Sequence, residues 1–266
     1  MQKIELNAKK IFDLTDRVVV ITGGAGLLGS QYAEAFCQVG AKVVLADLDY
    51  SKCKEIAVQL GKKYNSIAFA VKLDVTNKKS VNSMIKKIMK QFSKIDIFIN
   101  NAAIEDKHMT FEKMSLVTWN KILSVNLTGV FLCCQEVGKI MIRQNRGVII
   151  NINSIYGMVS VDQRIYDKTK LRSSVAYAAT KSGLLNLTRY LASHWSGTGI
   201  RVNCISFGGV ENDQTPNFIK NYSNKTMIGR MAQKEEYIGS LLFLASDASS
   251  YMTGSNLVVD GGWTAW

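Results

Sequence analysis

The sequence predicts an α/β protein with a doubly wound parallel sheet of about seven strands and helices on both faces. Short runs rich in β-branched residues alternate with longer segments of helical periodicity along the 266 residues. The strand-like runs are continuously apolar, as in parallel sheets that are covered on both sides. The sequence has no internal repeat, low-complexity tract or linker rich in proline and serine. We therefore expect a single domain over residues 1–266.

The expected elements follow one another in the strand–helix order of such a sheet. The first strand lies at Arg17–Thr22, and the amphipathic helix Leu28–Gly40 follows it and ends at a glycine. Later strands are expected at Lys42–Ala46, Ile67–Leu73, Ile95–Asn100, Val148–Asn153, Arg201–Phe207 and Asn256–Val259. Further helices are expected at Lys52–Tyr64, at Lys78–Phe92 and from Ser174 to His194. Because ligands bind beyond the carboxyl ends of the strands in these sheets, functional residues should follow strands.

The composition is that of an ordinary globular protein. With 47% hydrophobic and 20% charged residues, the chain is neither disordered nor collagen-like, and it is no disulfide mini-scaffold. Its five cysteines form no CxxC pair and no Cys/His cluster, so we expect free thiols in a reducing cytosol and no metal site. The N-terminus lacks the apolar core of a secretory signal, and no apolar run approaches the ~20 residues of a membrane span. We expect a cytoplasmic protein with no membrane partner.

The net charge of +12, from 33 basic and 21 acidic residues, is unusual. Nucleic acid, an anionic membrane or an acidic substrate would each explain it. The excess is mostly lysine dispersed over the expected helices, for example at Lys62, Lys63, Lys86 and Lys87. We find no aromatic motif for base stacking and no arginine-rich stripe. A solvated helix surface is therefore favoured over a nucleic-acid partner.

A glycine-rich segment joins the first strand to the first long helix. It runs Thr22-Gly23-Gly24-Ala25-Gly26-Leu27-Leu28-Gly29. Glycines allow the turn to close and the backbone to approach a pyrophosphate, while the helix N-terminus offers unpaired N–H groups and a partial positive charge. Candidate cofactor contacts are therefore Gly23, Gly26, Leu27 and Leu28. The alternative is a purely structural turn between strand and helix.

Two acidic residues end the next two strands. Asp47 lies about 20 residues after the glycines, where a carboxylate accepts hydrogen bonds from the ribose hydroxyls of NAD and repels the 2′-phosphate of NADP. No Lys or Arg follows until Lys52, and Asp49 adds another negative charge, so NAD is favoured over NADP. Asp74 is placed to meet the adenine. Either strand-terminal aspartate can instead cap the following helix.

Three tyrosines precede a lysine by four residues, a spacing that puts both side chains on one helix face. The lysine charge can then lower the tyrosine pKa from about 10 and ready the phenol for proton transfer. The pairs are Tyr50/Lys54, Tyr166/Lys170 and Tyr177/Lys181. Tyr50 opens an ordinary surface helix and Tyr166 lies in a polar, irregular stretch, whereas Tyr177 begins a long helix with a strong apolar face. The pair Tyr177/Lys181 is therefore favoured.

Several further motifs occur in a fixed order along the chain. They are Asn100-Asn101-Ala102-Ala103, Val125-Asn126-Leu127-Thr128-Gly129, Asn153-Ser154, Tyr177-Ala178-Ala179-Thr180-Lys181 and Arg201-Val202-Asn203. In this order they resemble the short-chain dehydrogenase/reductase family, from Phe12 to Trp263. The resemblance implies a Rossmann-type fold with a cofactor half at about 11–150 and a catalytic and substrate half at about 151–266.

The resemblance also implies a role for each matching residue. Tyr177 would be the catalytic acid/base, and Ser154 would polarise the substrate oxygen. Lys181 would hold the nicotinamide ribose, and Asn126 would hold a water in the proton path. Cofactor contacts would further include Val75, Asn100, Ala102 and Val210. The implied activity is hydride transfer between a nicotinamide cofactor and a secondary alcohol or ketone, carried out by a homotetramer or homodimer.

The chain departs from the family pattern at three places. Leu27 stands at the middle glycine position, Phe207 stands where a proline usually precedes Gly208, and an insertion lies within Met158–Ser173. The remaining glycine spacing is that of nucleotide-sugar epimerases and dehydratases, which we keep as an alternative activity. A non-catalytic NAD-binding sensor or scaffold is a second alternative. Because the insertion lengthens the sequence between Ser154 and Tyr177, Tyr166 lies nearer the usual distance from Ser154 and is a rival acid/base.

The insertion carries several charges between the expected catalytic serine and tyrosine. They are Asp162, Arg164, Asp167, Lys168, Lys170 and Arg172. Together with the glycine variant and Gly208–Asn212, the insertion resembles the flagellin-modification oxidoreductases of nonulosonic-acid sugar pathways. This resemblance implies a polar, sugar-like substrate, and the insertion is expected at the mouth of the substrate pocket. Arg164 or Arg172 can bind an anionic group of that substrate, the alternative being solvated loop charges.

Overall fold

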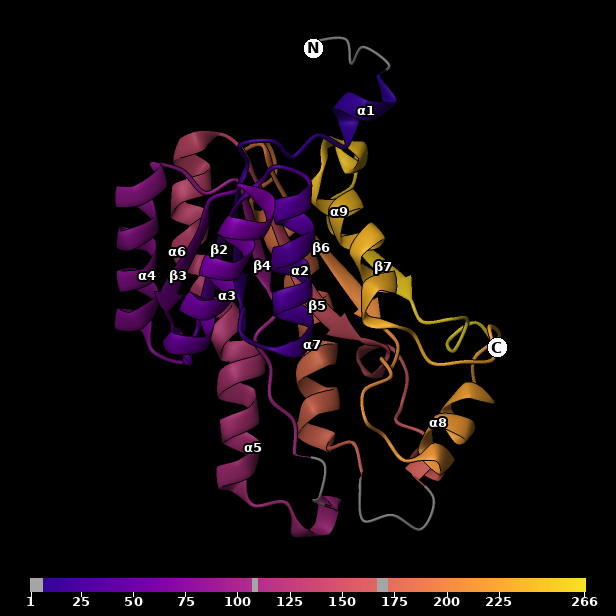
Figure 1. The fold of residues 1–266 in the computed structure, drawn as a ribbon. Coiled ribbons are helices and arrows are strands. Elements are labelled where there is room, and N and C mark those ends of the chain that lie inside the picture. The colour runs from indigo at the N-terminus through magenta and orange to yellow at the C-terminus, as the bar shows by residue number, and fades with distance from the viewer. Residues whose placement is uncertain (1–6, 107–109, 167–171) are drawn as a thin grey trace.

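The computed structural model describes residues 7–106, 110–166 and 172–266, and its centre is a parallel sheet (Figure 1). The strands are β1 (Val18–Thr22), β2 (Lys42–Asp47), β3 (Ala68–Lys72), β4 (Ile97–Asn100), β5 (Gly147–Ser154), β6 (Ile200–Phe207) and β7 (Asn256–Val259). Their order is β3-β2-β1-β4-β5-β6-β7, and every neighbouring pair is parallel. The predicted α/β fold class, a Rossmann-type doubly wound sheet, is confirmed.

The direction in which strands are added reverses between β1 and β4. Strands β2 and β3 extend the sheet on one side of β1, and β4 to β7 extend it on the other. Such a reversal opens a crevice beyond the carboxyl ends of the strands. The register pairs Thr22 with Ala46 and Ile21 with Ile99. The segments that follow β1, β2 and β4 therefore emerge together at this edge.

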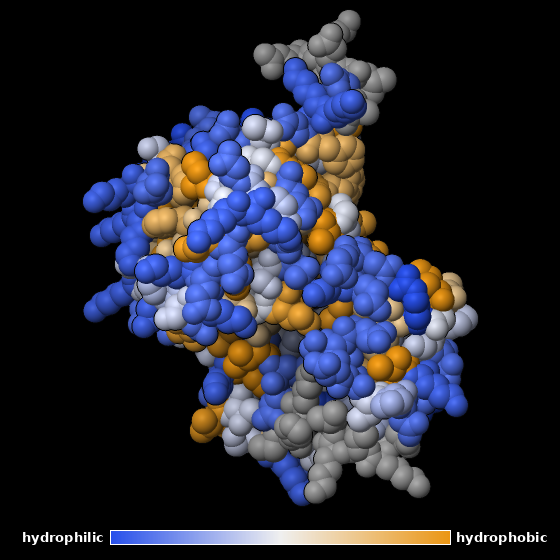
Figure 2. All heavy atoms as spheres, viewed as in Figure 1, coloured by the Kyte–Doolittle hydropathy of each residue, from blue (hydrophilic) through white to orange (hydrophobic). Residues whose placement is uncertain are grey.

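Helices cover both faces of the sheet. On one face lie α4 (Lys78–Phe92), α6 (Gly129–Gln144) and α7 (Val175–His194), and on the other lie α2 (Leu27–Gln38), α3 (Tyr50–Tyr64) and α9 (Ile238–Ala245). The remaining α-helices of the described residues are α1 (Ala8–Ile11), α5 (Leu116–Leu123) and α8 (Pro216–Ser223). Hydrophilic side chains gather over α3 and α4 in Figure 2. The lysines of these two helices that were named above, Lys62, Lys63, Lys86 and Lys87, are exposed to solvent.

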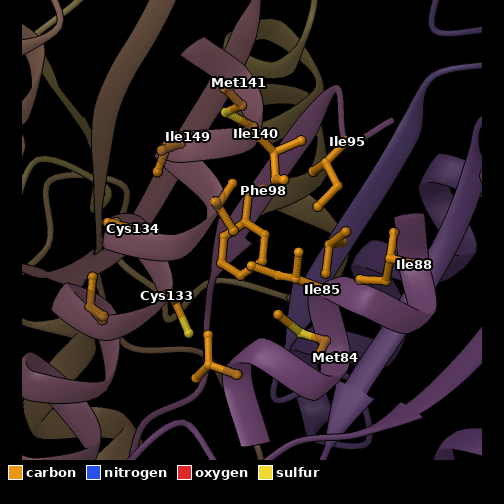
Figure 3. Packing of buried hydrophobic residues seen from close by; sticks show 14 of the residues in the cluster. Met84, Ile85, Ile88, Ile95, Phe98, Cys133, Cys134, Ile140, Met141 and Ile149 are labelled. Atoms are coloured by element: carbon orange, nitrogen blue, oxygen red, sulfur yellow. The ribbon is translucent and has the colours of Figure 1, made fainter. Parts of the chain in front are cut away.

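The continuous apolar strands are explained by burial on both faces. In β1, Val18 and Val20 belong to the core beneath α4, α6 and α7, whereas Val19 and Ile21 belong to the core beneath α2, α3 and α9. Figure 3 shows the first of these cores, where Phe98 of β4 lies among side chains of α4 and α6. A strand with only one buried face would alternate apolar and polar residues.

One helical run, Leu116–Gln144, is long and apolar enough to cross a membrane by length and composition alone. It joins α5, a π-helical turn at Ser124–Thr128 and α6, and 28% of its most apolar window is buried. This is weak evidence, since core helices meet the same criterion. Val137 and Met141 of α6 are fully buried against the sheet. The run therefore has a structural role in the fold, and the expected lack of a membrane partner stays a prediction.

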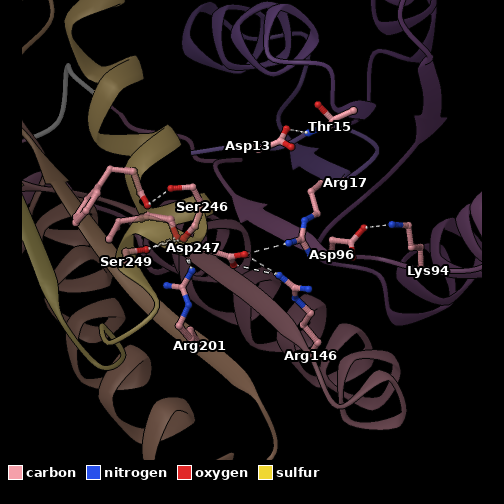
Figure 4. A network of polar contacts seen from close by, with 12 residues as sticks. Asp13, Thr15, Arg17, Lys94, Asp96, Arg146, Arg201, Ser246, Asp247 and Ser249 are labelled. Carbon is pink, nitrogen blue, oxygen red and sulfur yellow. Dashed lines mark hydrogen bonds and ion pairs between the residues drawn. The ribbon is translucent and has the colours of Figure 1, made fainter. Parts of the chain in front are cut away.

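Charged side chains join the strands at the opposite, amino-terminal edge of the sheet (Figure 4). Arg17 forms an ion pair with Asp247 at 3.3 Å. Asp96, whose side chain is 11% exposed, accepts a hydrogen bond from the backbone N–H of Val18 at 2.8 Å and pairs with Lys94 at 2.8 Å. Asp96 thereby ties the start of β4 to the start of β1.

Asp96→Ala is expected to lower the free energy of unfolding by about 1–3 kcal/mol, because the buried N–H of Val18 loses its acceptor. Urea unfolding followed by circular dichroism measures the change. Lys94→Ala is the matched control: it removes only a partly exposed ion pair and should cost less than about 1 kcal/mol. Equal losses in the two variants would contradict the role assigned to Asp96.

Candidate active site

Two adjoining cavities open at the carboxyl ends of the strands. A cleft of about 370 Å³ is lined by residues that follow β1 to β4. A second cavity of about 470 Å³ is lined mainly by residues that follow β5 and β6. Leu27, the first residue of α2, lines both. A ligand in the cleft can therefore reach a ligand in the second cavity beside Leu27.

The glycine-rich loop fits the backbone approach that a dinucleotide requires. Gly23 has φ +67°, and a Cβ there would lie 2.9 Å from Cα of Ala102. A Cβ at Gly29 would lie 2.1 Å from the carbonyl oxygen of Gly23, so only glycine lets α2 pack this closely on the turn. Helix α2 begins at Leu27 behind the N-cap Gly26, which offers no side chain to the first-turn N–H groups. These N–H groups can bind a phosphate.

Asp47 lines the same cleft. One carboxylate oxygen accepts a hydrogen bond from the backbone N–H of Ala25 at 3.1 Å, and the other accepts from the N–H of Asp49 at 3.1 Å. Asp49, and not Asp47, caps α3, since it accepts a hydrogen bond from the N–H of Lys52 at 3.0 Å. The carboxylate of Asp47 therefore supports the glycine loop and faces the cleft.

Most of the other residues predicted to contact the cofactor line the cleft, whereas Asn100 does not. The cleft is lined by Gly23, Gly26, Leu28, Asp74, Val75 and Ala102. Asp74 is no helix cap: it accepts hydrogen bonds from Thr76, while Asn77 caps α4. Asn100 does not line the cleft, because its side chain is 3% exposed and donates to Oδ1 of Asn151 at 2.8 Å. The Asn100 side chain thus joins β4 to β5, and its predicted cofactor contact stays a prediction.

Three of the residues with predicted catalytic roles come together at the second cavity. Tyr177 lies in the first turn of α7, whose N-cap Ser174 accepts a hydrogen bond from its backbone N–H at 3.2 Å. Its hydroxyl hydrogen-bonds with Ser154 at the end of β5. Lys181 lies one turn further along α7, with Nζ 5.3 Å from the centre of the Tyr177 ring. Val210, predicted for the cofactor, lines this cavity as well.

The pKa of Tyr177 differs from the sequence-based expectation. Burial raises the pKa of this phenol, the charge of Glu105 raises it further, and the hydrogen bond with Ser154 opposes the rise. Lys181 does not lower this pKa, since its ammonium group donates to the carbonyl oxygen of Ile152 at 2.8 Å. Lys181 is 3% exposed, and burial lowers its own pKa to about 8.

Asn126 lies in the π-helical turn between α5 and α6 and is 1% exposed. Its side chain accepts from the N–H of Ile104 and donates to the carbonyl oxygen of Ile104, both at 2.8 Å. A weaker contact reaches Oγ1 of Thr180 at 3.4 Å. The Asn126 side chain thus fixes the segment after β4 next to α7, and it does not line either cavity. π-Helical turns are frequent at functional sites.

The insertion contributes Tyr166 to the lining of the second cavity. Ile165 and Tyr166 are buried in a cluster with Tyr222 of α8 and Trp263. Tyr166 ends a short 3₁₀ helix, and Asp167, Lys168 and Lys170, named above for this segment, lie outside the described residues. Tyr166 therefore contributes packing and a hydroxyl to the cavity.

The two described arginines of the insertion lie elsewhere. Arg164 has a side chain that is 82% exposed and pairs with Asp162 at 2.8 Å. Arg172 lines a separate cavity of about 670 Å³ next to Phe111 and Met158. Neither arginine lines the cavity that contains Tyr177. The expected anion-binding role of these arginines is therefore not supported by their positions.

Sequence reasoning missed Glu105, which lines the second cavity beside Tyr177. No motif surrounds this residue. Its signal was its place shortly after β4, since functional residues in these sheets follow strands.

The matching family model, described as enoyl-(acyl carrier protein) reductase, covers residues 24–264. D-threitol dehydrogenase of Mycolicibacterium smegmatis is 33% identical over 99% of this chain and 98% of its own length. The chain belongs to the short-chain dehydrogenase/reductase family. Flagellin modification protein A of Campylobacter coli is also similar, with 30% identity over 94% of this chain and 99% of its own length.

Solved dehydrogenases have the same fold. One from Leptospira borgpetersenii with bound NAD⁺ is 34% identical, has a TM-score of 0.84, and matches over 99% of this chain and 98% of its own. A gluconate 5-dehydrogenase from Burkholderia cenocepacia, in complex with NADP and tartrate, is 29% identical with a TM-score of 0.90 over 98% of this chain and 100% of its own. This short-chain dehydrogenase/reductase is an NAD(P)-dependent oxidoreductase that acts on an alcohol or ketone, as the sequence predicted.

Proposed function

We propose that this short-chain dehydrogenase/reductase uses NAD to interconvert a secondary alcohol and a ketone within a small, neutral polyhydroxy compound. The observation that carries the proposal is the second cavity, where the hydroxyl groups of Tyr177 and Ser154 meet beside the dinucleotide cleft. Its described lining contains no lysine or arginine. The similarity to a D-threitol dehydrogenase supports a polyol substrate.

Each residue at the junction has a distinct task in this proposal. When bound, the nicotinamide accepts or returns a hydride. In the oxidation direction, Tyr177 takes the proton of the substrate hydroxyl, and in the reduction direction it returns a proton to the carbonyl oxygen. Ser154 hydrogen-bonds the reacting oxygen and keeps it near Tyr177. Lys181 leaves Ile152 to hold the ribose, and its positive charge then favours the phenolate form of Tyr177.

A substrate screen tests the proposal. We expect NADH formation with polyols of four to six carbons, much slower turnover of monohydroxy alcohols, and little turnover of phosphorylated sugars. Turnover of phosphorylated or nucleotide-linked sugars alone would overturn the polyol assignment. NAD binding without hydride transfer on any alcohol or ketone would favour a sensor or scaffold.

The preference for NAD rests on Asp47. Asp47→Asn keeps a hydrogen-bond acceptor for Ala25 but removes the charge that repels a 2′-phosphate, so the ratio of kcat/KM with NAD to kcat/KM with NADP should fall by about 10- to 100-fold. Steady-state kinetics with both cofactors measures this ratio. Glu55→Gln on α3 is the matched control, because it neutralises an exposed carboxylate outside the cleft and the ratio should stay within about threefold. An unchanged ratio in Asp47→Asn would refute the preference.

We also propose the organisation of the whole enzyme from the family. Residues 11–150 would form the cofactor half and 151–266 the catalytic and substrate half. A cytoplasmic homotetramer or homodimer without a nucleic-acid partner is consistent with five buried free cysteines and with lysines in solvent over α3 and α4. Trp266 is 73% exposed and available for a subunit contact, whereas Trp263 is buried within its own chain.

A further inference from the structure

The second cavity contains a carboxylate that the proposed mechanism does not use. Glu105 follows β4 and lines the cavity together with Tyr177, Ser154 and Tyr166. Its charge contributes to the raised pKa values of both Tyr177 and Tyr166. Glu105 is therefore close to the point where the reacting oxygen of a substrate would lie.

Glu105 is held in place by Ser173. The hydroxyl of Ser173 donates to Oε1 of Glu105 at 2.5 Å, and Ser173 is itself 3% exposed. The backbone of Ser173 is held in turn, since its carbonyl oxygen accepts from the side chain of Gln163 at 3.2 Å. Ser173 thus anchors Oε1 of a carboxylate that lines the substrate cavity.

The charge of the cavity distinguishes between ligand classes. Its described lining holds two carboxylates, Glu105 and Asp213, and no lysine or arginine, and the remaining polar groups are hydroxyls and amides. A carboxylate accepts hydrogen bonds but cannot donate them, and it repels a phosphate or a second carboxylate. A neutral compound with several hydroxyl groups satisfies such a lining.

We propose that Oε2 of Glu105 accepts a hydrogen bond from a substrate hydroxyl next to the reacting carbon. Through this contact Glu105 selects neutral polyols and excludes carboxylated or phosphorylated analogues. The proposal rests on the proposed function, because it assigns the substrate recognition of the same site. Ser173 is the positioning residue, which holds the carboxylate without touching the substrate.

Three four-carbon compounds test this assignment: threitol, 2-butanol and threonate. 2-Butanol lacks the neighbouring hydroxyls, and threonate carries a carboxylate. Glu105→Ala should lower kcat/KM for threitol by about 10- to 100-fold, the usual range for losing a hydrogen bond to a charged group, and change that for 2-butanol by less than about threefold. Glu105→Gln should raise kcat/KM for threonate by about tenfold, because the repulsion between carboxylates is removed.

Glu112→Gln is the matched control, since it neutralises an exposed carboxylate that does not line the cavity and should leave the threitol to 2-butanol ratio unchanged. NAD affinity, measured by fluorescence titration, should be the same in all variants and shows that the fold is intact.

Equal losses for threitol and 2-butanol in Glu105→Ala would overturn the role of Glu105 while leaving the proposed function in place. A wild-type enzyme that turns over no polyol would instead refute the proposed function itself. Faster turnover of 3-amino-2-butanol than of threitol would show that Glu105 recognises an ammonium group, which also overturns the assignment.

Discussion

Tyr177→Phe is expected to lower kcat by about 10³-fold while the affinity for NAD changes by less than about threefold. Phenylalanine preserves the ring next to Lys181, whose Nζ lies 5.3 Å from the ring centre, so the packing of α7 is kept. Only the hydroxyl is lost, and with it the hydrogen bond to Ser154 and the group that exchanges a proton with the substrate. Spectrophotometric NADH formation gives kcat, and fluorescence quenching gives the NAD affinity.

Tyr166→Phe is the matched control, because Tyr166 lines the same cavity and is the rival acid/base. Its hydroxyl hydrogen-bonds with Tyr156, and burial raises its pKa to about 12. Tyr177, and not Tyr166, lies next to Lys181, so we expect less than a tenfold loss of kcat in Tyr166→Phe. If Tyr166→Phe abolishes turnover and Tyr177→Phe does not, the assignment of the acid/base is wrong.

The fold was predictable because strands that are buried on both faces of a parallel sheet consist of consecutive apolar residues. Val18 to Ile21 are all buried, alternately against the two helical layers, so a continuous apolar run marks the strand without reference to distant residues. The glycines of the turn between β1 and α2 were predictive for a similar, local reason. The requirement at Gly29 comes from its own turn, where a Cβ would meet the carbonyl oxygen of Gly23.

The substrate cavity was only partly predictable, because its lining comes from separate segments that meet through tertiary packing. Glu105 follows β4, Ser154 ends β5 and Tyr166 comes from the insertion, and no local pattern links them. The charges of the insertion suggested an anion site, yet the side chain of Arg164 points into solvent against Asp162. Asn100 was assigned from its motif, but its side chain is used within the sheet.

The pKa of Tyr177 was unpredictable for a related reason. A spacing of four residues places Lys181 next to Tyr177, but it does not determine where the flexible ammonium group points. In the structure this group donates to Ile152, and burial dominates the pKa of the phenol. A desolvation effect depends on the complete surroundings of a group, which sequence spacing does not contain.

Lys181→Met is expected to lower kcat/KM by about 10²-fold and to stabilise the cofactor-free protein. The activity falls because the ribose contact and the positive charge near Tyr177 are lost. The stability rises because a charge that is 3% exposed no longer has to be buried: the pKa of Lys181 falls from 10.5 to about 8, on the order of 3 kcal/mol at about 1.36 kcal/mol per pKa unit. Loss of the hydrogen bond to Ile152 offsets part of this, so we expect a net gain of about 1–3 kcal/mol in urea unfolding at pH 7.

The pH dependence of this gain identifies its cause. Below pH 8, Lys181 is charged in both the folded and the unfolded protein, and the full desolvation cost is present. Between pH 8 and 10.5 the folded protein has lost this proton while the unfolded chain still binds it, so the wild-type protein gains stability as the pH rises. The advantage of Lys181→Met should therefore shrink from pH 7 to pH 10. Lys87→Met on α4 replaces an exposed lysine and should show no such trend, and an advantage of Lys181→Met that stays constant with pH would mean that burial of the charge is not its source.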